Sequence, residues 1–174
     1  MRAPSPSLRR SGRPLSPPVP GAVTPAYDPA GARVTVQFVV AWEVERKMTD
    51  KVGGKYTSAS RSILRLLWFM DFLQVLLTHL CGESPFKTLK EMAQDAYDKA
   101  LAPHHPYLVR KTIGAAMYFC PTEASFWKRI VEETSPPRDE AAVKVALRQF
   151  LVVMGPVRDQ LWGFFRELKL ENLP

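Results

Sequence analysis

The sequence predicts an all-α protein. From Val34 onward, apolar residues recur at the three- and four-residue spacing of helices that bury one face. Prolines, glycines and capping residues divide this pattern into segments of helical length. No stretch shows the two-residue alternation of a half-buried strand. Several segments are apolar on more than one face, which favours helices packed in layers over a simple bundle.

The first fifth of the chain differs in composition from the remainder. Residues 1–32 hold eight of the sixteen prolines, and residues 1–33 carry five arginines against one aspartate. Proline removes backbone donors, and this segment has too little apolar surface to offset the entropy of ordering it. We therefore expect residues 1–33 to be a disordered Pro/Arg-rich segment and residues 34–174 to form one helical domain.

The net charge of +7 does not indicate a nucleic-acid-binding protein. A net +4 lies in residues 1–33, and the remainder combines 19 basic with 16 acidic residues, an ordinary surface. Cys81 and Cys120 form neither a disulfide framework nor a metal-binding spacing. The N-terminal segment has no apolar core of the kind found in secretory signals. These features predict a cytosolic protein without a nucleic-acid partner.

The predicted helices follow one another with short connections. The first covers residues 35–49 and ends before the glycine pair at Gly53. Ser58 or Ser60 can cap the long second helix, which ends near Gly82. Its apolar run is long enough to resemble a transmembrane span, but an arginine, an aspartate, a glutamine and a histidine interrupt it. We expect this segment to be a buried helix of a soluble protein.

Four further helices complete the predicted domain. Pro106 opens one of them, since proline suits the first turn of a helix. Thr122 can cap the next, and Gly155-Pro156 is expected to kink or break the last. The four ranges are approximately 86–101, 106–120, 122–133 and 138–170.

Two arginines lie inside the most apolar stretch of the chain. Arg61 and Arg65 are four residues apart, so a helix places them on one face beside Trp68 and Phe72. Adjacent guanidiniums repel, and burying either without a partner costs several kcal/mol. Each could pair with a local acid or extend to solvent. An anion is the alternative partner, and phosphate matches the planar guanidinium bidentately.

Another stretch carries a resemblance to a known family. Residues 96–111, Ala-Tyr-Asp-Lys-Ala-Leu-Ala-Pro-His-His-Pro-Tyr-Leu-Val-Arg-Lys, resemble a signature of the glycolipid transfer protein superfamily. Residues 72–81 and 115–126 continue the likeness. The ending Leu170-Glu-Asn-Leu-Pro174 looks like the C-terminus of the ceramide-1-phosphate branch. The resemblance covers about residues 37–174 and implies a two-layer helical sandwich.

One position indicates the branch of the superfamily. Where glycolipid-binding members carry a tryptophan that stacks on the sugar ring, this chain has Arg65, and Arg61 matches a second arginine of the ceramide-1-phosphate branch. Two guanidinium groups match the charge and the hydrogen-bond acceptors of a phosphate monoester, whereas an aromatic ring packs against the face of a sugar. His105 matches the family histidine that binds the ceramide amide carbonyl. The resemblance thus implies that Arg61, Arg65 and His105 bind the lipid headgroup, and His104 is expected to face solvent.

The resemblance also implies a function, the transfer of a sphingolipid between membranes. Ceramide-1-phosphate is the implied cargo, with its chains in an apolar pocket, since each enclosed methylene contributes ~0.8 kcal/mol. Tyr107, Arg110 and Lys111 are candidates for membrane contact, because amphipathic rings and cations suit a membrane surface. We expect a cytosolic monomer that associates transiently with membranes.

The resemblance is incomplete on the N-terminal side. The superfamily domain opens with two helices ahead of the matched region, and the second carries an Asp-x-x-x-Asn/Lys element whose aspartate accepts the ceramide amide N–H. This chain shows no counterpart, so we expect a partial domain that lacks its first two helices. Two alternatives stay open: a non-transferring family member that acts as a protein-interaction or regulatory module, or a glycosphingolipid carrier.

No catalytic set can be assembled from the sequence. His105 has no acidic neighbour along the chain, and Cys120 beside Pro121 has the character of a core residue. We expect a protein that is not an enzyme and that uses neither a cofactor nor a metal.

Overall fold

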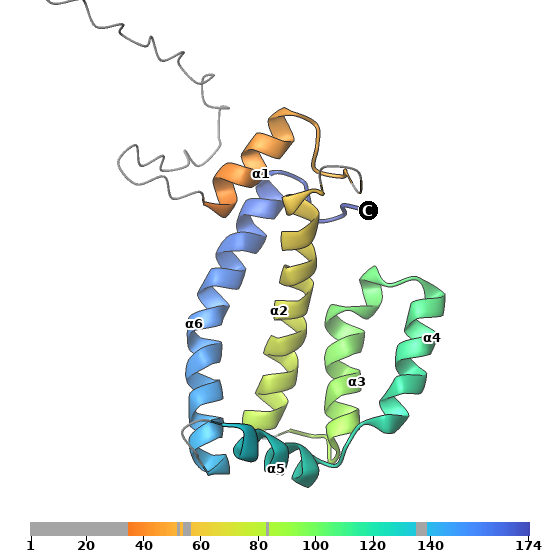
Figure 1. Ribbon diagram of the computed structural model, residues 1–174, viewed down its shortest axis with the longest axis vertical. Coiled ribbons are helices and arrows are strands. Elements are labelled where there is room, and N and C mark those ends of the chain that lie inside the picture. Colours follow the sequence, from red (N-terminus) through yellow and green to blue (C-terminus); the bar gives the residue numbers. More distant parts are fainter. Residues whose placement is uncertain (1–34, 52, 54–56, 83, 135–138) are drawn as a thin grey trace, which may run out of the picture.

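The computed structural model describes residues 35–51, 53, 57–82, 84–134 and 139–174, and every regular element in those ranges is helical (Figure 1). The all-α prediction is confirmed, whereas the predicted disorder of residues 1–33 lies outside the described residues. The elements are α1 (Val36–Glu45), α2 (Ala59–Cys81), α3 (Leu89–Ala100), η1 (Ala102–His104), α4 (Tyr107–Ala116), η2 (Met117–Phe119), α5 (Glu123–Glu133) and α6 (Glu140–Glu167).

Side-chain caps start the helices close to the predicted positions. Ser58, rather than Ser60, caps α2, because its Oγ accepts the backbone N–H of Arg61 at 3.1 Å. Helix α3 begins later than predicted. Its start is set by Thr88 and Glu91, whose side chains form a reciprocal capping box.

Two prolines behave differently from the prediction. Pro106 precedes α4 as its N-cap, and that helix gives way to η2 after Ala116. Helix α6 runs through Pro156 without a break, and Figure 1 shows it as one curved helix. Of the predicted kink or break, the break is wrong, since the helix continues on both sides of Pro156.

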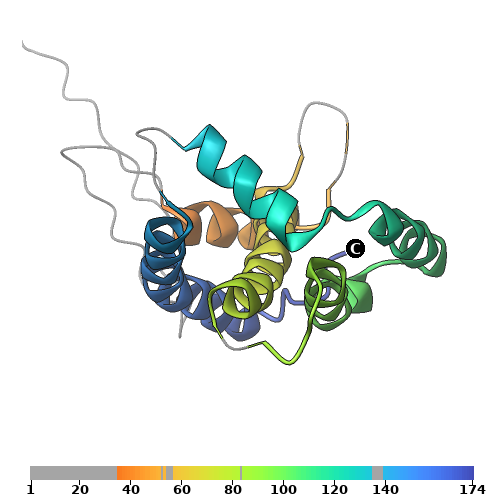
Figure 2. The ribbon, with the colours of Figure 1, turned by 90° about the horizontal axis from the view of Figure 1, so that it is seen from below.

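The helices are arranged as a layer with two crossing elements. Helices α6, α2, α3 and α4 lie side by side in that order, and α1 and α5 cross opposite ends of the layer (Figure 1). Seen along the layer in Figure 2, α5 covers one of its faces. Layered packing, rather than a simple bundle, is what the sequence predicted.

Two apolar clusters hold the layer together. The first lies at the α1 end and contains Val40, Leu64, Leu67, Trp68, Phe164, Phe165 and Leu170. The second lies at the α5 end and contains Leu77, Leu80, Cys81, Leu89, Met92, Trp127 and Val143. Cys120 packs against the second cluster, as predicted for a core residue. Helix α2 contributes to both clusters, so its two ends are held by buried apolar contacts.

Apolar side chains also lie on the surface. By length and composition, α2 is the one helix in the described ranges that could cross a membrane, a test that core helices of soluble proteins also pass. Its residues Leu64 and Leu67 are fully buried. On α6, in contrast, five large apolar side chains are exposed, namely Val145, Phe150, Val152, Val153 and Val157.

Candidate functional site

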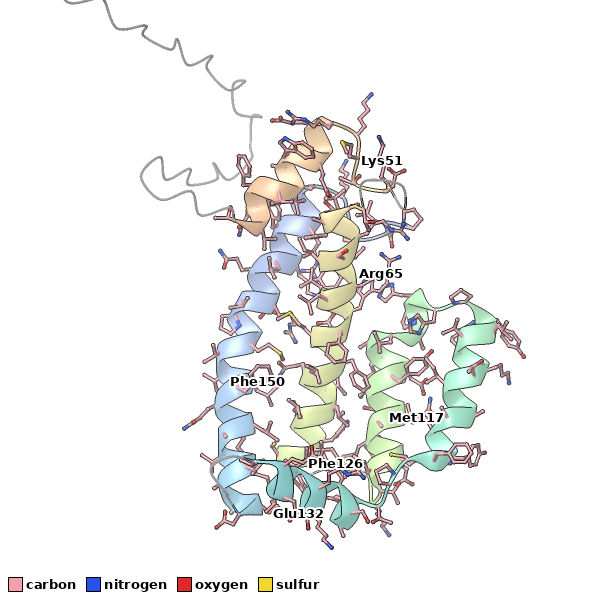
Figure 3. All side chains as sticks on the ribbon, in the orientation of Figure 1. Lys51, Arg65, Met117, Phe126, Glu132 and Phe150 are labelled. Carbon is pink, nitrogen blue, oxygen red and sulfur yellow. The ribbon has the colours of Figure 1, made fainter. Side chains whose placement is uncertain are left out.

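The arginine pair lies in the first two turns of α2. The Arg65 side chain is exposed and points toward the side of α2 on which η1 lies (Figure 3). Its Nη1 donates to the main-chain oxygen of Arg61 at 3.2 Å, and its Nη2 donates to the main-chain oxygen of Pro174 at 3.3 Å. The Arg61 acceptor is a neutral carbonyl, whereas Pro174 is the last residue of the chain as given, so its oxygen belongs to a carboxyl group that carries negative charge.

No acidic side chain neutralises this pair in the part of the chain that the structure describes. There, neither Arg61 nor Arg65 forms an ion pair with an aspartate or a glutamate. The Nε of Arg61 is buried and has no hydrogen-bond acceptor. A buried, unpaired donor on a charged group is costly, and structures rarely retain one without a reason. Of the two partners considered from the sequence, the local acid is therefore not the one found.

An aromatic stack lies beside the arginines. The rings of Trp68 and His104 are parallel within 3°, with their centroids 3.9 Å apart. The guanidinium carbon of Arg65 lies 5.9 Å from the centroid of the same Trp68 ring. His104 is exposed, as expected, but one face of its imidazole is covered by Trp68. The Trp68 indole N–H is buried without an acceptor, like the Nε of Arg61.

His105 is positioned by a different residue. Its Nδ1 lies 3.1 Å from the hydroxyl of Tyr97 on α3. Burial raises the pKa of the Tyr97 phenol, so its O–H stays available as a donor. When Tyr97 donates to Nδ1, the imidazole proton is on Nε2, which can then donate to a carbonyl oxygen. The sequence pointed to His105 but not to Tyr97, its hydrogen-bond partner.

A buried carboxylate fixes the start of α2. Glu43 of α1 is fully buried and accepts the backbone N–H groups of Ala59 at 2.6 Å and Ser60 at 2.8 Å. The hydroxyls of Ser58 and Ser60 also donate to Glu43. A negative charge here complements the exposed N–H groups and the dipole of the helix that carries Arg61. In the sequence, the only signal for this capping role is that Glu43 is an acid within an apolar segment.

Asp71, further along α2, pairs with side chains of α6 and not with the two arginines. The Trp162 indole N–H donates to Asp71 Oδ2 at 3.0 Å, and Arg158 Nε lies 3.5 Å from Asp71 Oδ1. Burial is the largest influence on Asp71 and raises the pKa of its carboxyl, while Trp162 and Arg158 act in the opposite direction.

The three predicted membrane-contact residues share one face of α4. Tyr107, Arg110 and Lys111 line a shallow concavity of ≈ 600 Å³ together with Gly114 and other residues of the same face. The Tyr107 side chain is 66% exposed, and the Lys111 ammonium lies 5.5 Å from the centroid of its ring. The concavity combines aromatic surface with two cations, and no acid lines it.

The predicted site residues therefore fall into three groups. Arg61 and Arg65 share the start of α2, His105 belongs to the turn after α3, and the membrane candidates lie on α4. Among the described residues, His104 rather than His105 is the histidine joined to the arginines, through Trp68. Those same ranges contain no cluster of three or more residues suited to hold a metal ion.

The chain is similar in sequence to proteins of a known family. The sequence profile of the family described as glycolipid transfer protein (GLTP) matches residues 23–132. A ceramide-1-phosphate transfer protein of Danio rerio is 34% identical over 96 residues, which are 54% of this chain and 46% of that protein.

Solved structures agree with the fold. A mutant of the Arabidopsis accelerated-cell-death 11 protein, complexed with C12 ceramide-1-phosphate, has a TM-score of 0.68 and 25% identity, covering 80% of this chain and 64% of that one. The apo-form of the mouse ceramide-1-phosphate transfer protein has a TM-score of 0.66 and 26% identity, covering 79% and 64%. The chain thus spans about half to two thirds of the length of these relatives.

Proposed function

Because this chain belongs to the glycolipid transfer protein family, we propose that it binds a phosphosphingolipid of the ceramide-1-phosphate type and transfers it between membranes. The observation that carries the proposal is an arginine pair with no aspartate or glutamate partner among the described residues, in which the buried Nε of Arg61 has no acceptor. A phosphate monoester supplies the missing negative charge and the missing acceptors in one group. The relatives that match the chain are named as carriers and not as enzymes, in keeping with a site that needs no covalent chemistry.

The headgroup site favours phosphate over sugar. No aromatic ring occupies the position of Arg65, and the tryptophan one turn further on has its face covered by His104. In our proposal Arg61 and Arg65 hold the phosphate, and the Nε2–H of His105 donates to the ceramide amide carbonyl. Next to Arg65 on α2, the exposed Leu66 and Phe69 offer apolar surface for the first methylenes of the chains.

Transfer also requires contact with a bilayer. We assign this contact to Tyr107, Arg110 and Lys111, which present an aromatic ring and two cations on an exposed face of α4. Anionic headgroups attract such cations from the cytosolic side, so the proposed location is the cytosol with transient membrane association.

Thermal unfolding with and without lipid tests the proposal. A ligand that binds only the folded state at one hundred times its dissociation constant adds about 2.7 kcal/mol to the free energy of unfolding. Short-chain ceramide-1-phosphate should raise the midpoint of a cooperative transition, and short-chain galactosylceramide should not. Equal shifts with both lipids would favour a glycosphingolipid carrier, and no shift with either would exclude this class of ligand.

The exposed apolar side chains of α6 favour a second candidate, a non-transferring interaction module. Val152 is 73% exposed and Val153 is 69% exposed, in a helix that also presents Phe150 and Val157. Apolar surface of this extent is typical of interaction sites. Light scattering separates the two functions: a monodisperse monomer that binds lipid supports the carrier, whereas lipid-independent assembly supports the module.

A further inference from the structure

The ring of His104 is stacked on Trp68. The two rings are parallel within 3° and their centroids are 3.9 Å apart. A cation above the face of an indole is attracted by it. The contact can therefore stabilise the imidazole of His104 in its protonated form.

Burial, more than any neighbouring charge, opposes the protonation of His104 in the absence of a ligand. Partial burial, and secondly the neighbouring His105, lower the pKa of His104, while the Asp71 carboxylate acts in the opposite direction. The influence of Asp71 is weakened because that carboxylate is already paired with Arg158 of α6. The Arg65 guanidinium over the same indole adds a further positive charge nearby.

We infer that His104 is a third cationic contact of the headgroup site, which takes up a proton when a phosphate monoester binds beside Arg65. The inference rests on the proposed function and adds to it a residue expected from sequence only to face solvent. The anion contributes the negative charge that His104 lacks in the free protein, and the bound imidazolium donates a hydrogen bond to a phosphate oxygen. Trp68 holds the ring in place and stabilises its charge.

Protonation of His104 predicts the direction in which lipid affinity changes with pH. A bound phosphate raises the pKa of His104, so the complex binds more protons than the free protein, and lipid affinity rises as pH falls toward the range in which His104 titrates. The lipid phosphate itself takes up a proton near pH ~6, which acts against this trend. A variant that cannot titrate at position 104 separates the two effects.

The test compares the wild-type chain with His104→Phe, which keeps a flat ring on Trp68 but cannot be protonated. Calorimetric titration with short-chain ceramide-1-phosphate, repeated in buffers of different ionisation enthalpy, gives the number of protons taken up on binding. We expect the wild type to take up more protons than the variant. At about pH 6 it should also bind about tenfold more tightly, the contribution of one charged hydrogen bond. Short-chain ceramide, which lacks phosphate, should cause no proton uptake.

A second measurement uses the unaltered protein. The chain has three histidines, so His104→Phe identifies the ring resonance of His104 in NMR spectra by its disappearance. In the wild type, that resonance should titrate at a higher pH with the lipid than without it. Proton uptake equal to that of the variant, or an unshifted resonance, refutes the role of His104 and leaves the proposed function standing. If the wild type binds no phosphate lipid at any pH, both are refuted.

Discussion

At the scale of single residues, the arginine pair combines two properties that seldom occur together. Arg65 is held by main-chain oxygens, and Arg61 has a buried Nε without an acceptor. The first property preorganises a guanidinium, and the second leaves a donor that only an added group can satisfy. An anion bound here would satisfy the free donor of Arg61 as well as pair with the charge of Arg65.

Arg65→Ala is expected to weaken binding of short-chain ceramide-1-phosphate by about 10- to 100-fold, because one charged hydrogen-bonding group is lost. The side chain is exposed, so the free energy of unfolding should change little. Fluorescence titration gives the affinity. Arg129→Ala removes the same charge from an exposed position on α5 and serves as the control. Unchanged affinity in Arg65→Ala contradicts the assignment.

Tyr97→Phe is expected to reduce affinity for ceramide-1-phosphate several-fold, since His105 would lose the donor that keeps its proton on Nε2. Sphingosine-1-phosphate has no amide carbonyl, so its binding should be unaffected by the change. Competition titration of both lipids on both proteins measures the difference. A loss of equal size for the two lipids would mean that Tyr97 acts on the fold and not on the amide contact.

At the scale of elements, α1 matters because it supplies the carboxylate that caps α2. Glu43 accepts two backbone N–H groups and two hydroxyls from the first residues around the helix start. These contacts set the position of α2 at the turn that carries Arg61. At the other end of α2, His79 Nε2 lies 2.8 Å from Asp95 on α3, and Lys99 lies 2.7 Å from the same carboxylate.

Glu43→Ala should lower the free energy of unfolding by about 2–3 kcal/mol, because it leaves buried donors at the start of α2 without their acceptor. Denaturant unfolding measures the change. Glu45→Ala, also on α1 but in an exposed ion pair with Arg46, should cost little in comparison. Similar losses in the two variants would show that the cap does not carry the stability.

Asp95 makes stability depend on pH in a predictable direction. Lys99 is the largest influence and His79 the next, and together they hold the pKa of Asp95 below its ordinary value of 3.8. The stabilisation is therefore complete above that value and is lost as pH falls through the lowered pKa. Thermal midpoints across this acidic range should fall more steeply for the wild type than for Asp95→Asn. Parallel curves would assign the acid sensitivity to other carboxylates.

At the scale of the whole molecule, the proposed headgroup residues and the proposed membrane-contact residues lie on neighbouring elements of one layer. Helix α2 carries the arginines, the turn after α3 carries the histidines, and α4 carries the aromatic and basic face (Figure 1).

Replacing both Arg110 and Lys111 by glutamine should reduce membrane association and the rate of lipid transfer, with lipid affinity in solution unchanged. Two exposed cations contribute about 1 kcal/mol each on an anionic surface, and salt should weaken the wild type more than the variant. Sedimentation with anionic and with neutral vesicles provides the measurement. A variant that transfers lipid at the wild-type rate would place the membrane contact elsewhere.

The helices could be predicted from the sequence because their signals are local. Ser58 and Thr122 cap helices through residues three positions away, and the spacing of Arg61 and Arg65 already places them on one face. At Pro156 the local signal allowed either a kink or a break, and the tertiary structure shows that the helix continues through the proline. The expected absence of the family's first two helices stays a prediction.

The all-helical class, the family and the shared face of Arg61 and Arg65 could be predicted from the sequence, since they depend on periodicity and on motifs within a few residues. Which groups meet across the fold depends on tertiary packing. Glu43 contacts Ser60, 17 residues away along the chain, and Trp162 contacts Asp71, 91 residues away. The stack of His104 on Trp68, and the lack of an aspartate or glutamate beside the arginines within the described ranges, also result from this packing. Such contacts depend on how helices pack, and no local pattern encodes their geometry.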